Sequence, residues 1–139
     1  MIVLDASVAL KWLVPGETDR DAALKVLDRV LERPEKFAAP ELLFMETAAV
    51  LARAQAITLT DRKRYVTYLE ELGLHRVGAG HEVLQTALEL SDRWKLSACD
   101  CIYLATATLM QGQWLTADER ALKRVRAKGL VLSLADWRG

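Results

Sequence analysis

The chain has 139 residues, which is the length of one domain with a substantial core. Its 52% hydrophobic and 27% charged content is typical of a soluble globular protein, so we expect one domain over residues 1–139. The formal net charge of zero excludes an overall field that attracts nucleic acid or anionic membranes, so a polyanion needs a local patch. No stretch has the roughly 20 apolar residues of a membrane span and no basic leader is present, so we expect a cytoplasmic protein without membrane contact.

Short apolar strands and amphipathic helices alternate along the chain, separated by Pro and Gly. In chain order we predict a strand Met1–Asp5, a helix capped by Ser7 and running to Leu13, a helix Asp19–Glu32, a strand Phe37–Ala39, a helix Glu41–Ala56 with Pro40 at its first turn, a helix Thr60–Leu72, a strand Leu74–Val77, helices His81–Trp94 and Ser97–Met110, a strand Gln113–Thr116, a helix Asp118–Ala127 and a strand Leu130–Leu134.

This alternation predicts the α/β class, with a parallel sheet covered on both faces because right-handed crossovers place helices there. In such sheets a site lies beyond the carboxyl ends of the strands, near the point where strand order reverses. Asp5 and Asp118 both end predicted strands, so we expect them at this edge. Glu46 and Asp100 must reach it from the N-terminal halves of their helices, where the dipole favours negative charge.

These four acids interrupt apolar segments that contain no Lys or Arg. An ionised carboxylate is costly in apolar surroundings unless something positive compensates it. A hard divalent cation, Mg2+ or Mn2+, prefers oxygen ligands and is the natural compensation. Taken singly, each acid could equally be a helix cap or a surface residue, so the prediction depends on the set.

Four segments of the sequence resemble the signature blocks of the PIN domain, and more narrowly of the VapC toxin ribonucleases of toxin-antitoxin systems. They are Ile2–Trp12, Ala39–Glu46, Ser97–Ala105 and Leu115–Asp118. The resemblance implies a single PIN-like domain, five parallel strands in the order 3-2-1-4-5, metal ligation by Asp5, Glu46, Asp100 and Asp118, homodimerisation and inhibition by a cognate antitoxin. One departure is Cys99-Asp100-Cys101, where the family often has Tyr-Asp-Ala.

The expected function is therefore a metal-dependent endoribonuclease, the toxin of a type II toxin-antitoxin system. It would hydrolyse RNA phosphodiesters by a metal-activated water at one or two ions. Ser7 and Thr116 lie two residues from Asp5 and Asp118, and their hydroxyls could orient metal-bound water, although Ser7 is equally suited to a plain helix cap. The chain's histidines, His75 and His81, are remote from the acid segments, which disfavours a histidine-based ribonuclease.

Local basic clusters are candidates for binding the phosphates that flank the scissile bond, or are plain solvated helix faces. The main cluster is Arg120, Lys123, Arg124, Arg126 and Lys128, and the weaker candidates are Lys11 and Arg62-Lys63-Arg64. Trp12, Trp94 and Tyr103 occupy apolar helical positions, which favours core packing or a dimer seam over base stacking.

Cys99 and Cys101 are two residues apart on a predicted helix and point to different sides, which disfavours a disulfide between them. We expect both to be buried small hydrophobes. A zinc site made from them with His75 and His81 lacks the usual spacing. Two further classes are kept as alternatives: a non-catalytic metal- or partner-binding α/β module, and a Mg-dependent phosphatase. A phosphatase of the haloacid dehalogenase type would have a second Asp where this chain has Ser7.

Overall fold

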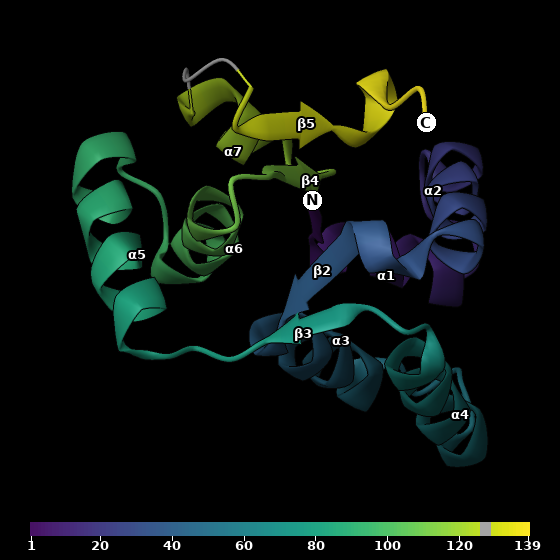
Figure 1. Cartoon of the computed structure of the whole chain (residues 1–139). Coiled ribbons are helices and arrows are strands. Elements are labelled where there is room, and N and C mark those ends of the chain that lie inside the picture. Colours follow the sequence, from purple (N-terminus) through teal and green to yellow (C-terminus); the bar gives the residue numbers. More distant parts are fainter. Residues whose placement is uncertain (126–128) are drawn as a thin grey trace.

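The computed structural model describes residues 1–125 and 129–139. Its centre is a parallel sheet of five strands in the order β3-β2-β1-β4-β5 (Figure 1). The strands are β1 (Ile2–Leu4), β2 (Phe37–Pro40), β3 (His75–Val77), β4 (Gln113–Thr116) and β5 (Val131–Ser133). The predicted α/β class and the strand order implied by the PIN resemblance are confirmed.

Helices cover both faces of this sheet, as Figure 1 shows, with α5 and α6 on one side and α1 and α2 on the other. The α-helices are α1 (Ala6–Leu13), α2 (Arg20–Glu32), α3 (Glu41–Arg53), α4 (Leu59–Glu71), α5 (His81–Trp94), α6 (Ala98–Leu109) and α7 (Glu119–Arg124). Two short 3-10 helices complete the described structure: η1 (Pro34–Lys36) directly precedes β2, and η2 (Leu134–Asp136) directly follows β5. In the described residues no helix is long and apolar enough to cross a membrane.

The central strands are buried because helices cover both of their faces. Full burial is found for Val3 and Leu4 of β1 and for Trp114 and Leu115 of β4. Burial on both faces explains why the sequences of these strands are continuous apolar runs. Trp12 and Tyr103 are also core residues, and Trp94 packs partly buried against the core, as predicted. Gly112 enters β4 so close to β1 that a Cβ there would overlap the carbonyl oxygen of Met1.

Several predicted boundaries are wrong in detail. Asp5, and not Ser7, caps α1: its backbone N–H is bound to the Leu115 carbonyl in the sheet, which holds it extended as a cap requires. Pro40 ends β2 and precedes α3, and α3 stops at Arg53, short of Ala56. The last predicted helix, Asp118–Ala127, begins one residue later, and its end at Ala127 lies outside the described residues.

Candidate active site

The four acids singled out in the sequence line one cavity of about 340 Å³ at the carboxyl edge of the sheet. Asp5 follows β1 and Asp118 follows β4, and these two strands are neighbours in the sheet. Glu46 lies in the second turn of α3, which begins directly after β2, and Asp100 lies in the first turn of α6. The chain reverses strand order between β1 and β4, which is where open parallel sheets place their sites.

Asp5 is the most deeply buried of the four, with 6% of its surface exposed. Its Oδ1 accepts a hydrogen bond from the backbone N–H of Ser7 at 2.8 Å, and its Oδ2 accepts one from Trp114 Nε1 at 2.9 Å. Burial raises the pKa of Asp5 from 3.8 to about 6, against the lowering effect of the Ser7 N–H. The carboxylate is thus fixed in place and is costly to ionise without a cation.

Glu46 and Asp100 are both half-buried. The hydroxyl of Tyr103 donates to Glu46 Oε2 at 2.6 Å. Burial raises the pKa of Glu46 and that of Asp100, and in each case a neighbouring acid, Asp100 or Asp118, adds to the increase. Burial also raises the pKa of the Tyr103 phenol strongly, so its hydroxyl keeps the proton that it donates.

Asp118 is positioned by the turn that follows β4. Its Oδ1 accepts from the Arg120 N–H at 2.9 Å and so caps α7, while its own N–H donates to Thr116 Oγ1 at 3.0 Å. Ser7 Oγ accepts from the Ala117 N–H at 3.1 Å and lies 3.4 Å from Thr116 Oγ1. These hydroxyls join the start of α1 to the loop that carries Asp118. Ser7 lines the cavity and Thr116 is fully buried beside it.

The cavity is electrostatically negative. Its acids raise one another's pKa values in a series, Glu46 acting on Asp5, Asp100 on Glu46 and Asp118 on Asp100. Among the described residues, one of the four acids forms an ion pair: Asp118 Oδ1 lies 3.9 Å from Arg120 Nε. An ion pair of this length on an exposed arginine compensates little of the charge.

The donor set fits a hard divalent cation. Carboxylate oxygens are the ligands that Mg2+ and Mn2+ prefer, and clustered buried acids are stabilised by such a charge. Within residues 1–125 and 129–139, no three acid, histidine or cysteine side chains are arranged so that together they could hold one ion. This agrees with Mg2+ sites that use one or two protein carboxylates and retain several waters. Ligation by Asp5, Glu46, Asp100 and Asp118 stays a prediction.

A second cavity, of about 320 Å³, shares Glu46, Asp100 and Asp118 with the first and continues to basic residues. Those residues are Lys95, from the end of α5, and Arg120 and Arg124 of α7. Two members of the predicted basic cluster therefore do lie beside the acids. Lys123 is exposed and lines neither cavity, and Arg126 and Lys128 lie outside the described residues.

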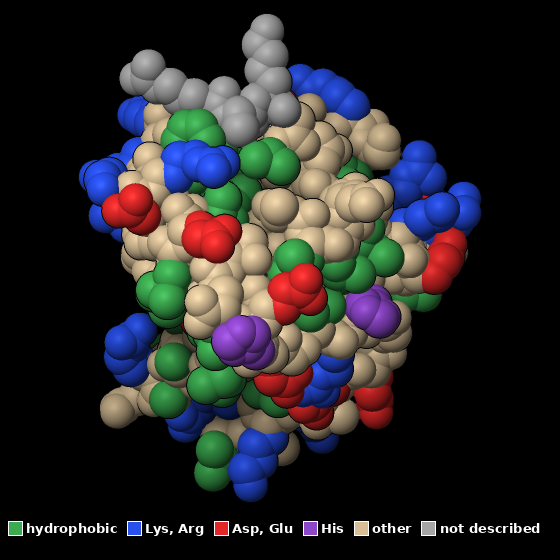
Figure 2. Space-filling view, turned by 60° about the vertical axis from the view of Figure 1, so that its left-hand side comes forward, with side chains coloured by type: hydrophobic (Ala, Val, Ile, Leu, Met, Phe, Trp, Pro, Cys, Tyr) green, Lys and Arg blue, Asp and Glu red, His purple; other side chains and the backbone are tan. Residues whose placement is uncertain are grey.

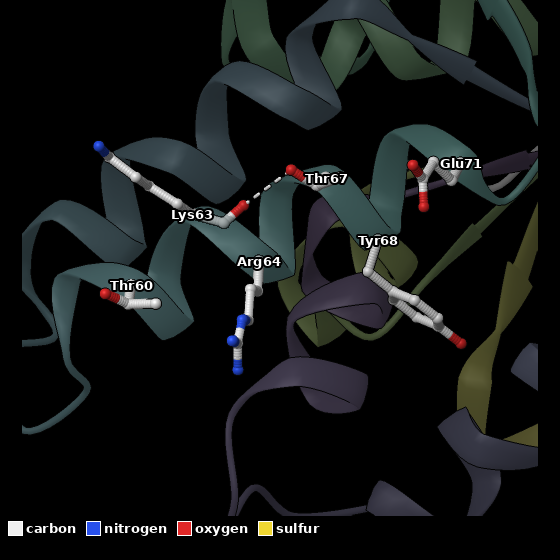
Figure 3. Close-up of a pocket in the computed structure, with 6 residues that line it drawn as sticks. All are labelled: Thr60, Lys63, Arg64, Thr67, Tyr68 and Glu71. Carbon is white, nitrogen blue, oxygen red and sulfur yellow. Dashed lines mark hydrogen bonds between the residues drawn. The ribbon is translucent and has the colours of Figure 1, made fainter.

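The weaker basic candidates lie elsewhere. Lys11 is 7% exposed, and its ammonium group donates to the Thr18 carbonyl at 2.8 Å, so it supports the fold and not the site. Arg62 donates to the Leu51 carbonyl at 3.3 Å. Lys63 and Arg64 line a separate cavity on α4, where their side chains point in different directions (Figure 3).

The histidines and cysteines form no site with the acids. His75 and His81 are exposed and line neither acidic cavity, and Figure 2 shows both purple side chains on an open face among charges of both signs. Both cysteines are free; Cys101 is buried as expected, but the expectation for Cys99 is wrong, because this thiol is exposed at the second cavity. Because Cys99 and Cys101 are two positions apart on α6, their side chains point in different directions, and Cys101 is the one that faces the core.

Sequence reasoning missed four residues near the acids. Arg53 lines the first cavity and Lys95 the second, and nothing in their local sequence marks them. Tyr103 is predicted from its apolar neighbours to be a packing residue, and Trp114 is predicted only as part of the strand Gln113–Thr116, yet each donates a hydrogen bond to an acid. The spacing of Tyr103 three residues after Asp100, on nearly the same helix face, was the available signal.

Comparison with known proteins identifies the family. The sequence profile of the PIN domain matches residues 2–128, and the chain belongs to this family. No curated protein sequence matches the chain significantly.

Solved structures of the same fold cover nearly the whole chain. A toxin-antitoxin complex from Klebsiella pneumoniae is 20% identical, with 96% of this chain and 98% of that chain aligned at a TM-score of 0.67. FitAcB from Neisseria gonorrhoeae is 18% identical, with 99% and 100% aligned at a TM-score of 0.76. The VapC20 toxin of Mycobacterium tuberculosis, which cleaves the sarcin-ricin loop, is 14% identical, with 91% and 98% aligned at 0.70. At these identities the likeness is one of fold.

Proposed function

We propose that this PIN domain protein is a metal-dependent endoribonuclease and the VapC-type toxin of a type II toxin-antitoxin system. The observation that carries the proposal is the set of four acids around one cavity at the point where strand order reverses. The similar folds of a toxin that cleaves the sarcin-ricin loop and of a toxin-antitoxin complex support the assignment. The non-catalytic module and the phosphatase remain the alternatives that the experiment below must separate.

The acids would hold one or two Mg2+ or Mn2+ ions, which would supply positive charge at the phosphoryl oxygens and lower the pKa of water so that it can act as the nucleophile. Asp5 has the most firmly fixed carboxylate of the four, because two hydrogen bonds orient it and 6% of its surface is exposed to solvent. Asp118 and Asp100 lie where both cavities meet, so a phosphodiester that enters the second cavity reaches them. Ser7 and Thr116 hold the Asp118 loop against α1.

RNA would be bound through the second cavity. Lys95, Arg120 and Arg124 line it together with three of the acids, so positive side chains lie next to the acids at which the scissile phosphate would be bound. Phosphates on either side of the cleaved bond would pair with these side chains, which gives affinity without base specificity. Because the formal net charge of the chain is zero, RNA has to be attracted by a local group of positive side chains such as this one.

A cognate antitoxin and a second copy of the chain are the proposed partners. Toxin-antitoxin complexes occur among the structures with similar folds, which supports an antitoxin. The described surface also carries large exposed apolar side chains on several helices, which a partner could cover. They include Leu31 of α2, Met45 of α3, Leu59 of α4, and Leu84 and Leu88 of α5.

The test is cleavage of structured RNA by the pure protein, with Mg2+ or Mn2+ and with excess EDTA. We expect cleavage with either ion, none after chelation, and recovery when the ion is restored. Asp100→Asn is expected to lose activity, whereas Asp28→Asn, whose side chain is exposed on α2 and lines neither acidic cavity, is the matched control and keeps it. Metal binding without cleavage would favour the non-catalytic module, and release of phosphate from monoesters the phosphatase.

A further inference from the structure

Two buried aromatic side chains donate hydrogen bonds to two of the acids. Trp114 Nε1 donates to Asp5 Oδ2 at 2.9 Å, and the Tyr103 hydroxyl donates to Glu46 Oε2 at 2.6 Å. The donors come from β4 and α6, and the acids follow β1 and lie on α3, so four elements meet in these two bonds.

The two rings form one rigid unit beneath the cavity. They are stacked, with centroids 6.0 Å apart and planes 4° apart, and Trp114 is fully buried while Tyr103 is 1% exposed. Stacked rings in a dense core have no room to change rotamer independently. The positions of their N–H and O–H groups are therefore fixed by the core, and so are the carboxylate oxygens that accept from them.

We propose that Tyr103 and Trp114 are positioning residues that hold Glu46 and Asp5 in the orientation that binds the divalent cation. The inference deepens the proposed function and depends on it for the identity of the bound ion. A carboxylate that already accepts a hydrogen bond from a fixed donor loses little rotational freedom when it binds a cation. This preorganisation raises its affinity for the cation. Outer partners of metal ligands typically contribute about 10- to 100-fold in metal affinity or activity.

Alternative explanations of the two bonds make different predictions. If the donors simply satisfied buried polar atoms, their removal would lower stability and leave the affinity for metal unchanged. Trp12 supplies the comparison, because its Nε1 donates to the Ala23 carbonyl at 2.7 Å, its side chain is 6% exposed, and it does not line the acid cavity. Trp12→Phe thus removes an equivalent buried bond away from the acids.

The experiment measures Mg2+ and Mn2+ binding to the metal-free full-length protein by titration calorimetry. Tyr103→Phe removes one oxygen and keeps the ring, and it is the informative variant if Trp114→Phe folds poorly. We expect each variant to weaken metal binding about tenfold or more, and Trp12→Phe to bind as the wild type does while losing similar stability. Saturating metal should restore the cleavage rate of Tyr103→Phe, because its defect lies in binding the ion.

A second readout needs no catalysis. In 1H–15N spectra the indole signal that Trp114→Phe removes should move when Mg2+ is added, whereas the signal that Trp12→Phe removes should stay in place. Unchanged metal affinity in Tyr103→Phe, or a wild type that binds neither ion, would overturn the inference. If the expected binding pattern is found but RNA is not cut, the inference stands and the proposed ribonuclease function fails.

Discussion

The buried carboxylate of Asp5 makes the stability of the metal-free protein depend on pH. Its pKa is about 6 in the folded state against 3.8 ordinarily, so between these values the folded protein holds a proton that the unfolded chain has released. The free energy of unfolding must therefore fall as the pH rises through this window. At about 1.4 kcal/mol for each tenfold change, the loss attributable to Asp5 is about 3 kcal/mol by neutral pH.

Asp5→Asn removes this pH-dependent loss but has a constant cost. The carboxamide keeps one acceptor oxygen, so either the Ser7 N–H or the Trp114 N–H loses its partner, which costs about 1–3 kcal/mol at every pH. We therefore expect the variant to be less stable than the wild type at acid pH and to reach or pass it at neutral pH. The difference between the two profiles is the quantity that tests the argument.

Urea unfolding followed by tryptophan fluorescence, in EDTA and at several pH values, measures both profiles. Asp28→Asn serves as the control, because its side chain is exposed on α2 and its stability profile should parallel that of the wild type. Parallel profiles for Asp5→Asn and the wild type between acid and neutral pH would refute the assignment of a raised pKa to Asp5. A difference that grows in the opposite direction would refute the sign of the linkage.

Four further outcomes are expected. Mg2+ should raise the melting temperature of the wild type, because it binds the folded state, and raise it less in Asp118→Asn; equal increments in calorimetry would exclude Asp118 as a ligand. Gly112→Ala should lower the free energy of unfolding by about 2 kcal/mol or more, since its Cβ would overlap the Met1 carbonyl between β1 and β4; wild-type urea stability would contradict this close approach. Cleaved RNA should carry 5′-phosphate and 3′-hydroxyl ends, with His75→Ala and His81→Ala cutting at near wild-type rates; 2′,3′-cyclic phosphate ends on sequencing gels would refute attack by water. The protein should be a dimer by light scattering at high concentration, and a monomer there would count against the proposed self-association.

The order of elements could be predicted from the sequence because local signals agree with tertiary structure over most of the chain. Helix α5 and strand β4 have the predicted bounds, His81–Trp94 and Gln113–Thr116, where periodicity, Gly punctuation and burial coincide. The strand order was implied by the family resemblance and not by periodicity. The convergence of the acids followed from two strand ends and two helix starts, which the α/β topology brings to one edge.

What could not be predicted depends on contacts between distant segments. Asp5 and Ser7 both have side chains that cap helices, and the choice between them is made by the bond from Asp5 N to the Leu115 carbonyl, which no local pattern contains. The hydrogen bonds of Tyr103 and Trp114 to the acids could not be predicted, because hydrophobic periodicity indicates burial and not the direction of an O–H or N–H. Lys95 reaches the second cavity from the end of α5, which depends on how α5 and α6 are joined.

The pairing of β1 with β4 has a consequence for when the protein can act. The two strands are neighbours in the sheet, yet the hydroxyls of Ser7 and Thr116 that join their ends are 109 positions apart in the chain. Contacts of such separation form late, after shorter-range helices and strand pairs, because closing a long loop is entropically unfavourable. A growing chain on the ribosome can hold Asp5, Glu46 and Asp100 while still lacking the strand that seats Asp118. On the proposed function, in which all four acids take part, the chain would be inert during most of its own synthesis, and its activity would begin with the completion of the fold.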